Sequence, residues 1–418
     1  MRPRLAPFLV SLAKAPMTLT YERARRALEG ASLPAVLVDL DAFDANLARH
    51  AVAAAESGVT IRFATKSIRV RALIERALAS PASQGLMCFS LPEAFALAVH
   101  GVDDLFVAYP TLHPDDLAVL AAFTERGTNI SLAVDSAEAV TAVAAAGRSK
   151  GVSPRVVLCT DMSLRLGGGR VHVGVRRSPL HEPADVVSLA ERARDAGLTV
   201  HGLLGYEAQV AGLGDDSPWD AGVVRLAKRA LRRLSMRELS ERRTSMGQAL
   251  QSRGFDLAFI NGGGTGSIDL TTPATGVTEV SAGSGLFKPL LFDAYTSPFV
   301  RSLEPSCFFA LEAVRRPAPG IITCLGGGYV ASGSAGPDKL PRPFLPRGLQ
   351  LTSMEGAGEV QTPLEGNAAD DIPLSAPVIF RHAKAGEVME RFREVLLVEG
   401  DHVVDRVPTY RGEGWCFL

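Results

Sequence analysis

Lysine is scarce in this chain of 418 residues: seven lysines stand against 37 arginines, and the net charge is only −1. The absence of an excess of either charge argues against a partner held by bulk charge, such as a nucleic acid or an anionic membrane surface. No window approaches the ~18 uncharged apolar residues that a membrane span needs. We therefore expect a protein that binds neither nucleic acid nor membrane.

Paired cysteines are also missing. The five cysteines are widely scattered and none has C-x-x-C spacing, which excludes a zinc ribbon and suits buried thiols in a reducing compartment. The N-terminal stretch MRPRLAPFLVSLAKAPM has a short apolar run interrupted by Pro7 and Lys14, which argues against a secretory signal peptide. We expect a cytoplasmic protein.

What the chain does have is a regular alternation of two kinds of segment. Short runs rich in Val, Ile and Phe alternate with longer Ala-, Arg-, Glu- and Leu-rich segments of helical period. The eight runs are 60–66, 85–90, 104–109, 129–135, 155–161, 200–207, 257–261 and 278–282. The helical segments are 41–57, 70–78, 92–99, 114–126, 137–145, 183–196 and 219–252. This alternation predicts a parallel sheet with crossover helices, and eight units fit a closed (β/α)8 TIM-type barrel. An open doubly wound sheet is the alternative.

The character of the sequence changes near Pro298. Helical periodicity fades, Pro and Gly rise, and short β-type runs appear at 308–313, 320–324, 377–380 and 395–398. We therefore predict a barrel domain over 30–298 and a mainly β domain formed by 1–29 plus 299–418. The run 33–40 has no barrel helix before it, and we expect it to pair with the C-terminal domain.

The first barrel strand is predicted to end at a lysine. In a (β/α)8 barrel the reactive groups lie at the carboxyl ends of the strands, and Lys66 follows the apolar run 60–66 there. A solvated loop lysine is the ordinary alternative. In a chain that otherwise prefers arginine, a lysine at this place suggests chemistry that arginine cannot perform, because arginine does not lose its proton to form an imine.

The seventh and eighth strands are followed by glycine clusters, NGGGTGS at 261–267 and SAGSG at 281–285. Barrels commonly hold phosphate in the loops after these two strands, and glycine lets the backbone approach an anion closely. Strands one and eight are neighbours in a closed barrel, so Lys66 and the two loops should meet. That juxtaposition suits pyridoxal 5′-phosphate, with its aldehyde on Lys66 and its phosphate in the loops. The glycine runs 167–169 and 326–328 are predicted to be turns.

These motifs together resemble a known family. The segment LPAVLVDLDAFDANL, the strand-terminal lysine and the GGGTGS and TEVSAGSG loops are similar to fold-type III pyridoxal-phosphate enzymes. Within them the chain resembles the D-threonine aldolase and D-serine dehydratase group, which shares the alanine racemase N-terminal barrel. The resemblance implies that Lys66 is the Schiff-base lysine, that Tyr206 lies near the pyridine ring and that Arg165 faces the cofactor. It assigns the phosphate to Gly264, Thr265, Gly266, Gly283, Ser284 and Gly285. Tyr206 as a core residue and Arg165 as a salt-bridge partner remain alternatives.

The chain departs from the group in one place. By resemblance, these enzymes bind a divalent metal through a C-terminal His-x-Cys or His-x-Asp pair, but here Lys384 stands two residues after His382. A protonated lysine repels a cation. One hypothesis is a metal on His382 completed by Glu387 or Glu355. The other is that Lys384 or Arg381 replaces the positive charge of the metal, or that Lys384 acts as a base.

The sequence therefore predicts a pyridoxal-phosphate-dependent lyase. We expect it to act on a small D- or β-hydroxy amino acid, by retro-aldol cleavage or β-elimination, with Lys66, Lys384 and His382 as catalytic candidates. The rivals are an amino-acid racemase of the same fold, a non-catalytic pyridoxal-phosphate-binding protein, and a metal- or phosphosugar-dependent barrel. The C-terminal TYRGEGWC segment is expected to pack on the β domain. By resemblance we also expect a homodimer, and the alternative for this segment is that Tyr410 or Cys416 reaches a neighbouring cofactor.

Overall fold

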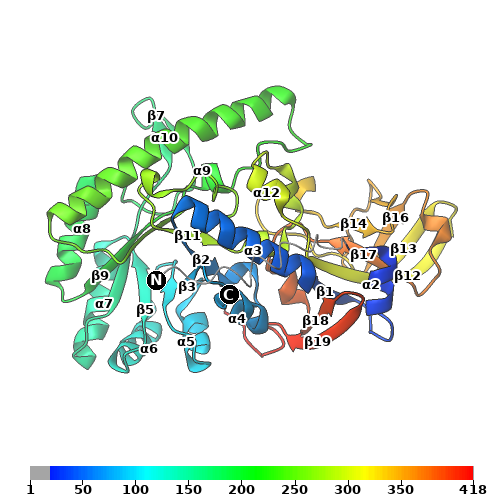
Figure 1. Ribbon diagram of the computed structural model, residues 1–418, viewed down its shortest axis with the longest axis horizontal. Coiled ribbons are helices and arrows are strands. Elements are labelled where there is room, and N and C mark those ends of the chain that lie inside the picture. The colour runs from blue at the N-terminus through cyan, green and yellow to red at the C-terminus, as the bar shows by residue number, and fades with distance from the viewer. Residues whose placement is uncertain (1–18, 418) are drawn as a thin grey trace.

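The eight predicted strands close into a barrel. In the computed structural model, which describes residues 19–417, eight parallel strands pair in the closed order β10-β11-β2-β3-β4-β5-β6-β9 (Figure 1). They are β2 (Thr60–Ala64), β3 (Ser83–Cys88), β4 (Leu105–Val107), β5 (Ile130–Val134), β6 (Arg155–Cys159), β9 (Thr199–Gly205), β10 (Phe259–Gly262) and β11 (Glu279–Ala282). Because β11 pairs with β2, the closed barrel is confirmed and the open sheet is wrong. The predicted absence of a signal peptide concerns residues outside the described part of the chain.

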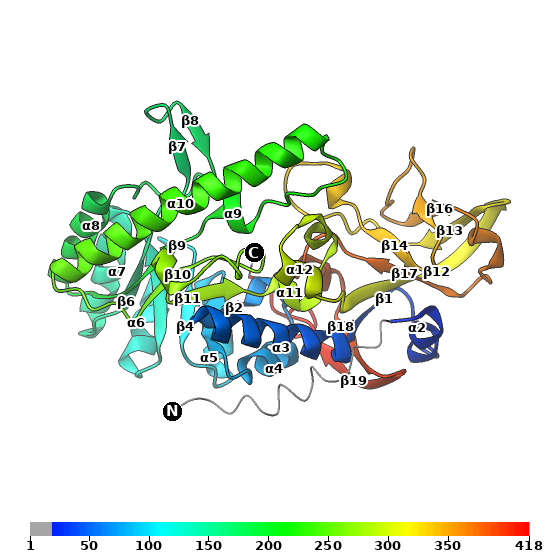
Figure 2. The same ribbon diagram turned by 45° about the horizontal axis from the view of Figure 1, so that its top comes forward.

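Helices cover the outside of the barrel. They are α3 (Leu40–Ser57), α4 (Arg71–Leu78), α5 (Leu91–Val99), α6 (Pro114–Glu125), α7 (Ala137–Lys150), α8 (Pro183–Asp195) and α10 (Gly222–Ser252). Asp39, Ser90 and Ser136 begin α3, α5 and α7 by accepting backbone N–H groups of the first turn. Glycines with left-handed φ, Gly58 and Gly151, end α3 and α7. Figure 2 shows α10 running across the barrel toward the second half of the molecule.

The interior of the barrel is filled at one end and open at the other. Near the amino ends of the strands, the Arg62 guanidinium bonds Glu279 and Asp104 at 2.8 and 2.9 Å, and the Phe106 and Phe259 rings pack at 5.6 Å. Toward the carboxyl ends the inward-facing residues are smaller and include Ala64, Ala108 and Ala133. The small side chains leave room above them for a cavity.

The second half of the molecule is a nine-stranded sheet in which an N-terminal strand lies among C-terminal ones. β1 (Ala35–Asp39) pairs antiparallel with β12 and parallel with β18, so the predicted pairing of run 33–40 is confirmed. The other strands are β12 (Cys307–Ala318), β13 (Ile321–Leu325), β14 (Arg342–Leu345), β15 (Gln350–Leu351), β16 (Gln361–Glu365), β17 (Pro377–Arg381), β18 (Glu394–Glu399) and β19 (His402–Pro408). Helix α2 (Tyr21–Ala27) packs on this sheet. The domain boundary near residue 298 stays a prediction.

Several elements were not predicted from the sequence. A hairpin of β7 (Leu164–Leu166) and β8 (Val171–Val173) stands out from the barrel (Figure 2), and the glycines 167–169 form its turn as expected. β14, β15, β16 and β19 were also missed. These strands are short or rich in Pro and charged residues, so hydrophobic alternation does not mark them. Within residues 19–417, no helix is long and apolar enough to cross a membrane.

Candidate active site

A cavity of about 1150 Å³ lies at the carboxyl ends of the barrel strands. Ala64, Met87, Ala108 and Leu204 form its floor. Its walls come from the barrel loops on one side and, on the other, from the segments 290–295, 338–342 and 384–387. The site therefore lies between the barrel and the C-terminal sheet of the same chain.

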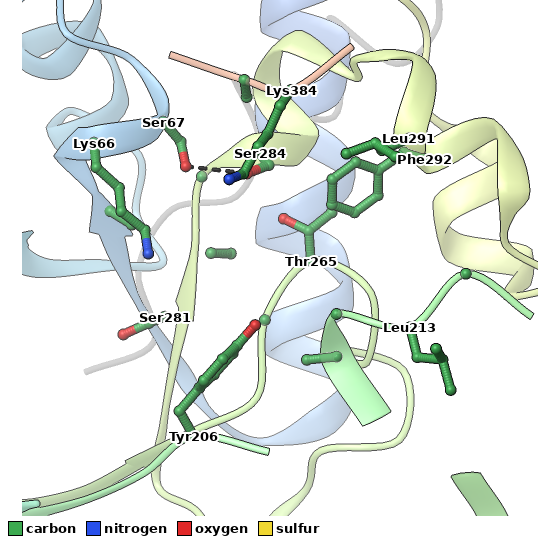
Figure 3. A pocket seen from close by; sticks show the side chains of 18 of the residues that line it. Lys66, Ser67, Tyr206, Leu213, Thr265, Ser281, Ser284, Leu291, Phe292 and Lys384 are labelled. Atoms are coloured by element: carbon green, nitrogen blue, oxygen red, sulfur yellow. Dashed lines mark hydrogen bonds between the residues drawn. The ribbon is translucent and has the colours of Figure 1, made fainter. Parts of the chain in front are cut away.

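Lys66 projects into this cavity, as the sequence predicts. β2 ends at Ala64, and the short 3-10 turn Thr65–Ser67 that follows directs the side chain inward (Figure 3). Lys66 Nζ donates a hydrogen bond of 2.8 Å to the hydroxyl of Tyr109. Tyr109 follows β4, at the end of the predicted run 104–109. The rule that strand-terminal side chains face the site would have identified it.

The loops after β10 and β11 meet beside Lys66. Gly264, Thr265, Gly283 and Ser284 line the cavity. The N–H of Gly285 donates to Thr265 Oγ1 at 3.1 Å, and the hydroxyls of Ser284 and Ser67 are 3.0 Å apart (Figure 3). These bonds join the two loops to each other and to the Lys66 turn.

Two of the predicted phosphate residues lie behind the cavity wall. A Cβ on Gly266 would lie 2.2 Å from the Ala211 carbonyl oxygen, and one on Gly285 would lie 2.5 Å from the His50 ring. These glycines allow close packing of the loops, while Gly264 and Gly283 form the surface of the cavity itself. Their contact with a phosphate stays a prediction.

The residues present fit pyridoxal 5′-phosphate. One wall offers hydroxyls and glycine backbone without side-chain bulk, which suits a phosphate. Lys66 supplies an amine for the aldehyde, and Figure 3 shows it extending into the space that this wall borders. Lys66, Thr265 and Ser284 would hold the cofactor.

A buried ion pair supports the loop after β10. Arg243 on α10 and Glu207 after β9 are fully buried and bonded at 2.9 Å, and both Glu207 carboxylate oxygens accept the N–H of Gly263 at 3.0 Å. Arg243 also donates to the Gly205 carbonyl oxygen at 3.0 Å. Neither residue was singled out from the sequence, because only the fold brings α10 against the end of β9.

Tyr206 lines the cavity, and Figure 3 shows its hydroxyl directed toward the loop that carries Thr265. Burial raises the pKa of Tyr206 to about 12, so the hydroxyl keeps its proton at neutral pH. The guanidinium of Arg177 lies 5.7 Å from the centre of the ring. A core position for Tyr206 is therefore wrong, although its contact with a pyridine ring stays a prediction.

Arg165 lies on the hairpin strand β7 rather than in the cavity wall. Its guanidinium donates to Asp161 at 2.7 Å, which is the salt-bridge alternative. The cavity is lined by Arg177 in its place. Arg177 follows the hairpin, whose existence the sequence did not reveal, so the sequence carried no signal for it. A role for Arg165 toward the cofactor stays a prediction.

His382 does not face the cavity. It is 2% exposed, and burial together with the neighbouring Arg381 lowers its pKa to about 3. Among the described residues, neither ring nitrogen has a well-formed hydrogen bond, although the Cys307 backbone lies nearby. Arg381 is bonded to both carboxylate oxygens of Asp293 at 2.6 and 3.0 Å, so it is not available to replace a metal.

Lys384, two residues on, does line the cavity. Its Nζ lies 3.0 Å from Ser332 Oγ and 3.0 Å from a carboxylate oxygen of Glu387. The Lys384 side chain is 45% exposed, so it is not the desolvated group that the hypothesis of a lysine base requires. Within residues 19–417 no group of three or more His, Cys, Asp or Glu side chains could hold a metal. The donor set does not fit a divalent cation on His382.

The protein-family comparison agrees with this geometry. The model of the alanine racemase N-terminal domain matches residues 38–288, which include the whole barrel. The chain belongs to this family. Membership confirms the resemblance found in the sequence.

Relatives extend the likeness beyond the N-terminal domain of the family. A D-threonine aldolase from Arthrobacter sp. is 26% identical over 383 residues, 91% of this chain and 93% of the relative. The D-threo-3-hydroxyaspartate dehydratase from Delftia sp. (strain HT23) is 28% identical over 261 residues, 62% of each chain. The solved D-threonine aldolase from Filomicrobium marinum has 21% identity and a TM-score of 0.75, covering 96% of this chain and 99% of that one. The fold similarity therefore includes the C-terminal sheet.

The C-terminal segment packs on the barrel of its own chain. Tyr410 is 1% exposed; its hydroxyl donates to Glu93 at 2.9 Å and its N–H to the Arg69 carbonyl oxygen at 2.9 Å. Trp415 packs on His100. Arg69 in turn donates to the carbonyl oxygen of Lys66 at 3.2 Å. The segment also contacts the β domain, because the Thr409 N–H donates to the Arg393 carbonyl oxygen at 3.0 Å. It therefore packs on the β domain as expected and on the barrel as well, where it supports the Lys66 turn. A contact with a neighbouring subunit stays a prediction.

Glu93, which accepts the Tyr410 hydrogen bond, should make the stability of the fold depend on pH. Burial raises the pKa of Glu93 to about 7, so the folded state holds the proton more tightly than the unfolded chain. The free energy of unfolding should fall as pH rises from about 4.5 to about 7 and then level off. Glu93→Gln stays uncharged, so its unfolding free energy should lack this fall. Urea unfolding from pH 5 to pH 8 should show the wild type losing ~2 kcal/mol relative to the variant. Parallel pH profiles for the two proteins would contradict the assignment.

Proposed function

We propose that this protein is a pyridoxal-phosphate-dependent lyase that acts on a small D- or β-hydroxy amino acid. The reaction is retro-aldol cleavage or β-elimination with release of ammonia. The observation that carries the proposal is the meeting of Lys66 with the loops after β10 and β11 in one cavity. The names of the relatives support it, because threonine and 3-hydroxyaspartate are both β-hydroxy amino acids.

The side chains divide the work of such a reaction. Bound in this cavity, pyridoxal phosphate supplies an electron-accepting ring that stabilises a carbanion at the substrate Cα. Lys66 would attach it through Nζ, and the same Nζ would move the proton at Cα. The Tyr109 hydroxyl orients Nζ. Tyr206 keeps its proton at neutral pH and would serve as a hydrogen-bond donor in the cavity. The Arg177 guanidinium lies over its ring.

The test combines a spectrum with product analysis. Purified protein supplied with pyridoxal phosphate should develop a visible absorbance band and should convert D-threonine or D-serine. Glycine with an aldehyde indicates retro-aldol cleavage, and a 2-keto acid with ammonia indicates β-elimination. D-alanine turned into L-alanine would instead identify the racemase. A protein that develops no band contradicts the proposal.

We propose further that the protein is a homodimer. Val223, Leu226, Ala230 and Leu234 follow helical spacing along α10 and are exposed, an apolar stripe of the kind found at interfaces. Light scattering that reports the mass of a single chain would contradict the dimer.

We propose a cytoplasmic location on the basis of the thiols. Cys88, Cys307 and Cys324 are buried and form no disulfide, and burial raises the pKa of the Cys324 thiol to about 12. Thiols kept in this state suit a reducing compartment. Fractionation of the source cells with an antibody against the protein tests the location.

A further inference from the structure

A ring of hydrogen bonds fixes Lys384 in the cavity wall. The Ser332 hydroxyl donates to Glu387 at 2.7 Å and accepts from Lys384 Nζ at 3.0 Å, while Nζ also contacts Glu387 at 3.0 Å. The Ser332 N–H donates to the other oxygen of Glu387 at 2.7 Å. Burial opposes ionisation of Glu387, but these hydrogen bonds and the Lys384 charge outweigh it and lower its pKa. An ammonium has three N–H donors, so one remains for a ligand in the cavity.

The segment that carries Lys384 lies directly against the turn that carries Lys66. A Cβ on Gly386 would lie 1.9 Å from the carbonyl oxygen of Lys66, and Gly386 has a left-handed φ of +81°. Only glycine fits this contact, which brings the two lysine-bearing segments together. In Figure 3 the two side chains enter the cavity from different sides.

The other cations of the cavity are committed elsewhere. Lys228 pairs with Asp220 and Lys339 with Asp338. Arg342 lies over the Trp219 ring at 5.0 Å, and Arg69 pairs with Glu390 at 2.8 Å. Arg177, over the Tyr206 ring at 5.7 Å, does not release its proton at neutral pH. Among the other lysines that line the cavity, Lys384 is the one whose segment lies against the Lys66 turn.

The two reactions need different groups at the β-oxygen of the substrate. Retro-aldol cleavage needs a base at the β-hydroxyl, whereas β-elimination needs an acid that gives a proton to the departing hydroxyl. We propose that Lys384 is that acid, so that the protein is a metal-independent β-eliminating enzyme. This rests on the proposed function and narrows it.

The step balances without a further reagent. Lys66 Nζ takes the proton from Cα, the Cβ–O bond breaks with its electron pair on oxygen, and Lys384 gives that oxygen a proton, so water leaves. Solvent restores the proton of Lys384. The released enamine takes up water and yields a 2-keto acid and ammonia. Glu387 and Ser332 are positioning residues that hold the ammonium in place.

The experiment compares variants of the holoenzyme on D-serine, D-threonine and D-threo-3-hydroxyaspartate. We expect full activity after dialysis against a chelator, with no stoichiometric metal by elemental analysis, and keto acid with ammonia as the products. Lys384→Gln should lower the rate of elimination by about 100-fold or more, the usual contribution of a general acid. Lys384→Arg should be as slow as Lys384→Gln, because arginine does not release its proton at neutral pH. Lys150→Gln removes an exposed lysine paired with Glu125 outside the cavity and should leave the rate unchanged.

A second readout separates this inference from the proposed function. Exchange of the Cα hydrogen of D-alanine with D2O, followed by NMR, needs Lys66 but no acid at a β-oxygen, so Lys384→Gln should retain it. If the wild type shows no exchange and no cofactor band, the proposed function fails and the inference with it. If exchange occurs, the inference alone is overturned by any of three results. These are normal elimination by Lys384→Gln, activity that requires an added divalent metal, or glycine and aldehyde as the products.

Discussion

Lys66→Ala is expected to lower kcat by about 10³-fold or more, because the variant loses both the covalent attachment of the cofactor and the base beside Cα. Lys66 lines the cavity, and its Nζ donates a hydrogen bond to Tyr109 at 2.8 Å. The visible band of the bound cofactor should disappear with the amine. Borohydride reduction followed by peptide mass spectrometry should locate the cofactor on the peptide that contains Lys66 in the wild type and on no peptide in the variant.

Lys66→Arg is the matched control. It keeps the positive charge and most of the length of the side chain but lacks the nucleophilic amine. If the enzyme needs only the charge of Lys66, this variant should be active; if it needs the amine, the variant should be inactive. The circular dichroism and thermal midpoint of both variants should stay near those of the wild type, because the side chain makes no buried contact. A Lys66→Ala protein with a normal rate, or a cofactor attached to another lysine, would contradict the assignment.

Arg243→Met is expected to destabilise the fold by about 3–5 kcal/mol, the usual cost of removing one partner from a buried ion pair. The variant leaves the Glu207 carboxylate fully buried without its cation. Since that carboxylate also holds the Gly263 N–H, the loop after β10 should shift and the affinity for pyridoxal phosphate should fall. Urea unfolding of the cofactor-free protein gives the first quantity, and a fluorescence or absorbance titration with the cofactor gives the second.

Two further variants test whether burial of the Arg243–Glu207 pair causes the loss of stability. Arg253→Met breaks the exposed pair with Glu191 and should cost about 1 kcal/mol at most. Glu207→Gln combined with Arg243→Met removes the uncompensated charge and should be less destabilised than Arg243→Met alone, because the two effects are coupled. Equal losses for Arg243→Met and Arg253→Met would mean that the buried pair has no special role.

The barrel was predictable because its signal is local. Strands that are covered on both faces read as apolar runs, and the helices between them repeat their apolar residues with a helical period. The runs 60–66 and 278–282 mark β2 and β11 to within a few residues. The C-terminal sheet was predicted less completely, since β14, β16 and β19 carry prolines and charged residues that hide the alternation.

The site was predictable where it depends on the end of a single strand. Lys66 and the glycine loops each follow one apolar run, and the barrel rule then places them together. Arg177, Glu207 and Arg243 followed no such rule. Each acts through a contact with a segment distant in sequence, such as α10 against β9. The same holds for Tyr410, whose partner Glu93 lies 317 residues away.

By itself, the amino-acid sequence determined the closed barrel, the lysine at the end of its first strand and the glycine loops beside it. The spacing of apolar residues within each run and the order of the runs along the chain can both be read from neighbouring residues. The tertiary structure decided how the remaining polar groups are used. It buried His382, bonded Arg381 to Asp293 and directed Lys384 into the cavity with Glu387 and Ser332. The scarcity of lysine drew attention to these positions, but the charge and partners of a side chain depend on which distant segments surround it. Only folding brings those segments together.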